Sequence, residues 1–138
     1  MREILFRGKR EDNGEWVEGF LIGRYDPTQK GHIIKNAFID NGTCFYDPDK
    51  VIPETVGQFT GLFDKNGKRI FEGDIVKLEE DVRTFFRIRN GEVHFLGGSF
   101  LVGDNDHNLL STLYALSNQE WILRGEVIGN IHDNPELR

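Results

Sequence analysis

The stretch from Gln58 to Lys77, QFTGLFDKNGKRIFEGDIVK, decides the fold of this chain. Its first apolar run leads to Asn66-Gly67, a pair that supplies the positive φ values of a tight hairpin turn. The chain then returns through Ile70-Phe71, passes Gly73-Asp74 and enters another apolar run. We therefore predict a strand, an Asn-Gly turn, a returning strand, and a further strand that begins at a tight turn.

Asn-Gly pairs recur along the chain and predict a protein made mostly of strands. They occur at Asn13-Gly14, Asn41-Gly42, Asn66-Gly67 and Asn90-Gly91. They separate runs of β-branched and aromatic residues, which are the residues that strands favour. For the first pair, a two-residue turn would place Gly8 opposite Gly19, so we expect a longer loop or a bulge there.

The region from Val82 to Gly103 is predicted to form a three-stranded meander with turns at Asn90-Gly91 and Gly97-Gly98. Both turns give the same register, and a slip of one residue would move every side chain to the opposite face. One face collects apolar residues: Phe86, Ile88, Val93, Phe95, Phe100 and Val102. The other face collects Arg87, His94 and Leu101, with Phe85 and Leu96 nearby.

One helix is predicted, from Asp106 to Ser117. Its leucines recur at helical spacing, and Asp106 is a suitable N-cap. Their positions are Leu109, Leu110, Leu113 and Leu116. A final strand is predicted from Trp121 to Ile131, because Asn134-Pro135 then ends the regular structure.

These elements predict a β-dominated α+β protein. Residues 1–56 would form an N-terminal β-rich lobe, and residues 57–138 would form an SH3-like barrel with one short helix. A strand that starts at Gly73-Asp74 and leads into a meander is typical of such barrels, and closure removes exposed strand edges. Two lobes that share a single core remain an alternative.

Three blocks of the sequence resemble the YopX family, a group of small phage and prophage proteins with no assigned activity. The blocks are Met1–Gly8, the central stretch Gln58–Lys77, and Val127–Leu137 (VIGNIHDNPEL), and they occur in the family's order. The central block is specific, since Thr-Gly-Leu, Asn-Gly and Glu-Gly-Asp-Ile-Val occur together at fixed spacing. The resemblance implies a phage or prophage origin and self-association, and it supplies no catalytic or binding residue.

Composition narrows the classes of function. The formal net charge of −6 argues against general nucleic-acid binding, which depends on clustered Lys and Arg. Cys44 is the only cysteine, so the chain can form no internal disulfide and no Cys-based zinc site. No apolar run approaches the roughly 18 residues of a membrane span. We expect a cytoplasmic protein without a cofactor.

A candidate interaction surface comes from the predicted meander. Arg83, Phe85, Arg87 and Arg89 alternate along one strand, and Leu96 and Leu101 make the same face unusually apolar. Basic residues interleaved with an aromatic ring can hold a single-stranded nucleic acid. Apolar residues on such a face can instead be covered by the predicted helix or by another protein.

Polar residues in turns offer no complete catalytic or metal site. Asp74 is expected to accept hydrogen bonds from backbone amides of its own turn, and a catalytic carboxylate would need an acid-base partner. Asp104–His107 lacks the Gly and the distant Glu of a calcium loop. We therefore expect no metal and no enzyme.

These arguments predict a phage or prophage accessory protein that acts by binding in the host cytoplasm. It would bind to itself, as a homo-oligomer, and to a host or phage protein. The alternative is a single-stranded nucleic-acid binder that uses the face from Arg83 to Arg89.

Overall fold

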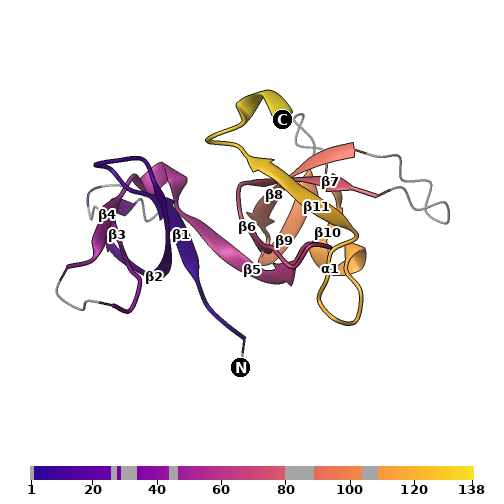
Figure 1. Cartoon of the computed structure of the whole chain (residues 1–138), viewed down its shortest axis with the longest axis horizontal. Helices are drawn as coiled ribbons and strands as arrows, with labels where there is room; N and C mark the ends of the chain where they lie inside the picture. The colour runs from indigo at the N-terminus through magenta and orange to yellow at the C-terminus, as the bar shows by residue number, and fades with distance from the viewer. Residues whose placement is uncertain (1, 26–27, 29–33, 44–46, 80–88, 104–108) are drawn as a thin grey trace. The chain divides into compact units, whose positions relative to one another are not determined.

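The protein is described by a computed structural model, which divides into two compact units, Met1–Phe59 and Thr60–Arg138. The structure describes all residues except 1, 26–27, 29–33, 44–46, 80–88 and 104–108. Nearly all regular structure is strand (Figure 1), so the β-dominated class is confirmed.

The first unit is an antiparallel meander. Its elements are β1 (Phe6–Lys9), β2 (Trp16–Tyr25), β3 (Ile34–Asp40), β4 (Asp49–Val51) and a 3-10 turn, η1 (Pro53–Thr55). In the hairpin of β1 and β2, Lys9 lies opposite Trp16 and Phe6 lies opposite Gly19. The connection therefore runs through Arg10–Glu15, which confirms the longer loop expected around Asn13-Gly14.

Alternate residues of this meander form a small core. Its fully buried residues are Ala37, Ile39 and Val51, and the half-buried residues that pack on them are Phe6, Val17, Leu21 and Val56. The end of β4 returns to the end of β1, because Ile52 N donates to Lys9 O at 2.9 Å. Gly8 leaves the space that Val51 fills, since a Cβ at Gly8 would lie 3.0 Å from the Val51 side chain.

The second unit contains the strands that follow β5 (Gly57–Phe63), together with a short helix and a 3-10 turn. β5 starts in the first unit and continues into the second. Next come β6 (Arg69–Phe71), β7 (Asp74–Leu78), β8 (Arg89–Leu96), β9 (Ser99–Gly103), β10 (Leu109–Thr112), α1 (Leu113–Leu116), β11 (Gly125–Asn130) and η2 (Pro135–Leu137). The strand orders are β4-β3-β2-β1-β5-β6 in one sheet and β10-β9-β8-β7-β11 in the other. The elements predicted in the central stretch Gln58–Lys77 are confirmed as β5, β6 and β7.

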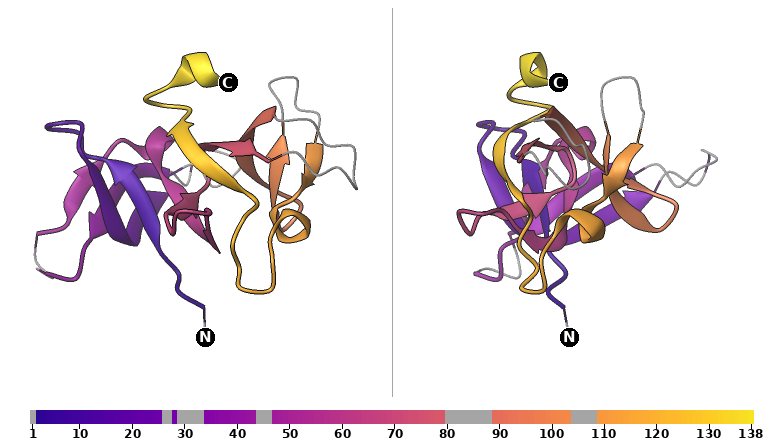
Figure 2. Two further views of the ribbon diagram at one scale, coloured as in Figure 1. Left: turned by 45° about the vertical axis from the view of Figure 1, so that its right-hand side comes forward. Right: turned by 90° about the vertical axis from the view of Figure 1, so that its right-hand side faces the viewer.

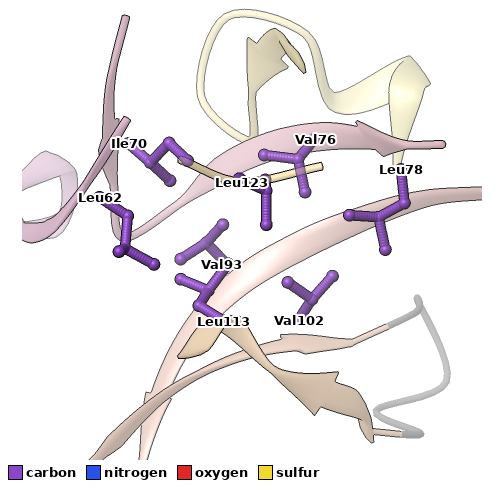
Figure 3. Close-up of a cluster of buried hydrophobic side chains, with 8 residues drawn as sticks. All are labelled: Leu62, Ile70, Val76, Leu78, Val93, Val102, Leu113 and Leu123. Carbon is purple, nitrogen blue, oxygen red and sulfur yellow. The ribbon is translucent and has the colours of Figure 1, made fainter. Parts of the chain in front are cut away.

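The core of the second unit gathers side chains from segments that are far apart in the sequence (Figure 3). Its buried residues are Leu62, Ile70, Val76, Leu78, Val93, Val102, Leu113 and Leu123. The described strands form two antiparallel sheets without a closed barrel, so the SH3-like barrel expected for residues 57–138 is not confirmed.

The hairpin of β8 and β9 has the predicted register. Val93 lies opposite Val102 and Phe95 lies opposite Phe100, across the turn at Gly97-Gly98. Both glycines have positive φ, at 57° and 79°. Of the predicted apolar face, Val93 and Val102 are buried, while Phe86 and Ile88 lie outside the described residues.

The predicted turn at Asn90-Gly91 is wrong. Both residues lie inside β8, where Asn90 is opposite Lys77 and Gly91 is opposite Val76 of β7. The antiparallel meander is therefore β7-β8-β9 instead of three strands within residues 82–103. Gly91 is buried in this sheet, so pairing with β7 has overridden the local turn preference of the dipeptide.

The helix predicted from Asp106 to Ser117 is also largely wrong. Leu109–Thr112 form β10, which pairs with β9, and only Leu113–Leu116 form a helical turn. Thr112 caps this turn, since its Oγ1 accepts from Ala115 N at 3.2 Å. The proposed cap Asp106 lies outside the described residues. The final strand starts at Gly125 instead of Trp121.

Candidate functional site

Two aromatic side chains, Tyr114 and Trp121, form an exposed pair in the second unit. Tyr114 is 74% exposed and Trp121 is 55% exposed. Their ring centroids are 6.2 Å apart and the ring planes are tilted by 48°. Tilted aromatic pairs at this separation attract one another. The pair therefore presents a pre-arranged apolar surface to the solvent.

The backbone at Trp121 has a conformation that large side chains rarely adopt. Its φ is 63°, and it is the only non-glycine residue with positive φ among the residues that the structure describes. A left-handed conformation costs a residue with a Cβ roughly 1–2 kcal/mol. Strained backbone of this kind occurs disproportionately at functional sites, so it marks Trp121 as a candidate binding residue.

Asn118 holds the turn that places Trp121 in this conformation. Its Oδ1 accepts from Glu120 N at 2.9 Å and from Ile122 N at 3.1 Å. Its backbone N donates to Ile122 O at 2.9 Å, and its carbonyl accepts from Trp121 N at 3.1 Å. The loop that joins α1 to β11 extends away from the neighbouring strands in Figure 2. Four hydrogen bonds therefore fix a loop that packing alone would not fix.

Both aromatic residues are also anchored through their neighbours in the sequence. Leu113 precedes Tyr114 and is 1% exposed, and Leu123 follows Trp121 by two residues and is fully buried. Arg124 N donates to Leu116 O at 3.1 Å, which joins the two ends of the loop. Each exposed ring therefore lies within two residues of a side chain that is buried in the core.

The predicted interaction surface is only partly described. Leu96 is 53% exposed at the end of β8, and Leu101 is half-buried opposite His94. The backbone of Arg89 begins β8, opposite Leu78. Arg83, Phe85 and Arg87 lie outside the described residues, so the assembly of the six predicted residues into one surface stays a prediction.

Several buried carboxylates have structural partners. Asp74 is 1% exposed, and its Oδ2 accepts from Phe71 N at 2.8 Å, which confirms the predicted turn role. Glu92 is 7% exposed, and its Oε2 accepts from Arg138 Nε at 2.8 Å. His94 Nδ1 lies 3.6 Å from Glu92 Oε1. Each carboxylate thus holds a strand or turn in place.

Two shallow depressions lie on the first unit. Their volumes are about 310 and 340 Å³, and both are lined by Glu11 and Lys50, whose charged groups are 3.2 Å apart. Arg10 lines the first, with its Nη2 2.7 Å from Asp12 Oδ2. Since the charges that line the first depression pair with one another, that depression offers a charged ligand little net attraction.

The hydrogen bond between Arg10 and Asp12 shifts the pKa values of both side chains. The hydrogen bond from Arg10 lowers the pKa of the Asp12 carboxyl below its ordinary value. The same bond raises the pKa of Arg10. Both side chains are at the surface, so this pair reports on local geometry and is no sign of a catalytic group.

Metal-ligating side chains do not cluster in the part of the chain that the structure describes, where no group of three His, Cys, Asp or Glu could hold an ion. The Asp104–His107 segment lies outside that part. None of the described helices has the length and apolar character needed to cross a membrane.

The family is shown by a match to the profile described as YopX protein, which covers residues 5–137. The chain therefore belongs to the YopX family. It is also similar to a solved structure, the crystal structure of protein EF1440 from Enterococcus faecalis. That similarity has 26% sequence identity, a TM-score of 0.57, and 99% coverage of both chains. No functionally curated protein matches the sequence.

Sequence patterns missed the aromatic pair because they assigned its members to regular elements. Tyr114 was expected in a long helix and Trp121 at the start of a strand. Asn118 carried the available signal, since Asn side chains favour turns in which they accept backbone N–H groups.

Proposed function

We propose that this protein is a non-enzymatic binding module that uses Tyr114 and Trp121 to hold a protein partner. The observation that carries the proposal is the exposure of both rings on a loop fixed by Asn118. Tyr and Trp are enriched among residues that contribute most to binding, because they bury a large area and lose little entropy.

The proposal that the module has no catalytic activity is supported by the roles of its buried carboxylates. Asp74 and Glu92 are occupied by a backbone amide and by an arginine, respectively. A general acid or base must reach a proton of the substrate. A carboxylate already bonded to a backbone amide or to an arginine of the same chain is poorly placed for this.

Membership of the YopX family supports a phage or prophage accessory role. We propose that the partner is a host or phage protein that this module meets in the host cytoplasm. Homo-oligomers form part of the same proposal.

The alternative is a single-stranded nucleic-acid binder that uses the face from Arg83 to Arg89. It predicts an affinity that decreases with salt, because phosphate contacts release counterions. It also predicts that neutralising Arg87 and Arg89 abolishes capture of nucleic acid.

The first experiment is a tagged capture from a lysogenic host with two matched variants. Trp121→Asn removes the ring but keeps a residue that tolerates positive φ. Ile4→Ser is the control, since Ile4 is 53% exposed and lies in the other unit. We expect one protein to be captured in stoichiometric amount by wild type and Ile4→Ser but lost with Trp121→Asn.

Equal capture of that protein by all three forms would contradict the proposed site. Capture of nuclease-sensitive nucleic acid that depends on Arg87 and Arg89 would favour the alternative function. Both readings require that each variant keep the wild-type circular dichroism spectrum.

A further inference from the structure

The outward face of β2 carries an ordered set of four side chains. Glu18, Phe20, Ile22 and Arg24 alternate with residues that point to the other face, where Val17 and Leu21 pack on the core of the first unit. Phe20 is 63% exposed and Ile22 is 47% exposed. Glu18 and Arg24 are also exposed. Two large apolar side chains therefore lie between an acidic and a basic one.

Neighbouring strands extend this apolar strip. Ile22 lies opposite Phe38 of β3, and Phe38 lies opposite Lys50 of β4. Phe38 is half-buried, so part of its ring remains accessible beside Ile22. Contiguous apolar residues on a sheet face that are rimmed by charges are typical of protein contact surfaces.

The four side chains are arranged symmetrically about Leu21. Phe20 and Ile22 lie one residue from it on either side, and Glu18 and Arg24 lie three residues from it. A two-fold axis that lies between two such faces, level with Leu21 and perpendicular to the strand, would run a second β2 antiparallel to the first. Glu18 of each copy would then meet Arg24 of the other, and Phe20 would meet Ile22. The surface is therefore complementary to itself in both charge and apolar character.

We propose that this face of β2 binds a second copy of the same chain, face to face, with β2 antiparallel to its counterpart. Two-fold dimers use the same patch on both subunits, so a self-complementary pattern is what such an interface requires. Sheets that pack face to face lie about 10 Å apart and keep their strands within about 30° of alignment.

The apolar and charged residues have different roles in this contact. Phe20, Ile22 and Phe38 supply the apolar area that becomes buried. The two Glu18–Arg24 pairs lie at the rim, where ion pairs mainly set register and discriminate between partners. Glu18 lies opposite Arg7 within its own chain, and a carboxylate has room for further hydrogen-bond donors. The inference rests on the homo-oligomer part of the proposed function, uses the first unit only and does not involve the Tyr114–Trp121 site.

Charge reversal gives a direct test by sedimentation velocity at several concentrations of the full chain. Wild type should be a dimer. Glu18→Arg and Arg24→Glu should each weaken self-association about tenfold, since each places like charges at both rim contacts. An equimolar mixture of the two variants restores both opposite-charge contacts, so it should form a heterodimer of wild-type strength.

Glu18→Arg places an arginine opposite Arg7 of the same chain and could therefore misfold. Further variants keep the inference testable in that case. Ile22→Ser should also weaken the dimer about tenfold, because it removes the apolar contact with Phe20 of the other copy. Ile4→Ser is the matched control, because it makes the same substitution at a residue that is 53% exposed and lies before β1, and it should leave the dimer unchanged.

Three results would overturn the inference. They are a monomeric wild type, an oligomer unaffected by Arg24→Glu and Ile22→Ser, and folded charge variants that fail to associate when mixed. A monomeric wild type would also contradict the homo-oligomer part of the proposed function, whereas failure to capture a protein through Tyr114 and Trp121 would contradict its partner-binding part alone.

Discussion

Asp64 and Val127, which are 63 residues apart in the sequence, are joined by a hydrogen bond: Asp64 Oδ2 accepts from Val127 N at 3.0 Å. The other carboxylate oxygen accepts from Asn66 N and Lys68 N, both at 2.9 Å. Lys65 N donates to Gly125 O at 3.0 Å. Within the second unit, the turn between β5 and β6 therefore pairs with the outer edge of β11.

This bond also protects an edge strand. β11 is the last strand of its sheet in the strand order, and its outward N–H and C=O groups could pair with another chain. Asp64 and Lys65 occupy two of those groups. The Asn66-Gly67 turn thus has a role beyond reversing the chain, since it places the Asp64 carboxylate against β11.

Replacing Asp64 should strongly destabilise the protein. Asp64 is 1% exposed, and Asp64→Ala would leave three backbone N–H groups without their acceptor. We expect a loss of about 2 kcal/mol, chiefly from Val127 N, because a donor left unsatisfied away from water costs about 1–3 kcal/mol, whereas Asn66 and Lys68 are exposed and can bond to water. Asp64→Asn keeps one acceptor oxygen and should cost less. Urea unfolding measures both, with Lys65→Ala as a neighbouring surface control. A wild-type midpoint for Asp64→Ala would refute this role.

Asp74 should behave as a turn residue and not as a catalytic one. Its Oδ2 accepts from Phe71 N at 2.8 Å within the turn that starts β7. Asp74→Ala should cost about 2 kcal/mol of unfolding free energy, whereas Asp74→Asn retains a carbonyl acceptor and should cost less. Thermal unfolding of the two variants tests the order. Equal stability of both variants and wild type would mean that the bond contributes nothing.

Gly125 should not tolerate a side chain. A Cβ at this position would lie 2.5 Å from Lys77 O, a backbone atom of the paired strand. We expect Gly125→Ala to cost about 1–3 kcal/mol, as other overpacked sites do. Gly97→Asn is the control, because Gly97 has φ +57° and nothing within 4 Å. Equal free energies of unfolding for the two variants would show that β11 and β7 do not approach one another closely at Gly125.

The Arg10–Asp12 pair should give a small acid dependence of stability. The pKa of the Asp12 carboxyl is lowered in the folded protein, chiefly by the hydrogen bond from Arg10. Its stabilising contribution is therefore present above the pKa of an unfolded aspartate and is lost as the pH falls through the folded value. Carbon-detected NMR titration should show the Asp12 midpoint rising toward an ordinary aspartate in Arg10→Gln. An unchanged midpoint would exclude Arg10 as the cause.

Sequence patterns predicted turns correctly where a glycine is needed for its conformation. Gly67, Gly73, Gly97 and Gly98 have positive φ, and the pairing of β8 with β9 across Gly97-Gly98 is as expected. Asn90-Gly91 has the same letters as a hairpin turn but is buried in β8 against Val76. A dipeptide reports local preference only, and the pairing of β8 with β7 depends on a strand that lies before residues 80–88.

The leucines of residues 109–116 show a second limit. Leu113 is buried in the core and Leu116 packs against it, so their inward placement was predictable from spacing. The conformation was not, because a short apolar run fits a strand as well as a helix. The pairing of β10 with β9 determines that Leu109–Thr112 form a strand. Tyr114 and Trp121 became neighbours only through the turn held by Asn118, which no periodic pattern represents.

The central claim is that Tyr114 and Trp121 bind a protein partner. Once that partner is captured, isothermal titration calorimetry of wild type, Trp121→Asn and Ile4→Ser tests it most directly. Removing an interface aromatic that dominates binding costs about 2 kcal/mol or more, which corresponds to at least about a thirtyfold change in Kd. The account predicts that loss for Trp121→Asn and an unchanged Kd for Ile4→Ser. Equal Kd values for all three proteins, each with wild-type thermal stability, would contradict it.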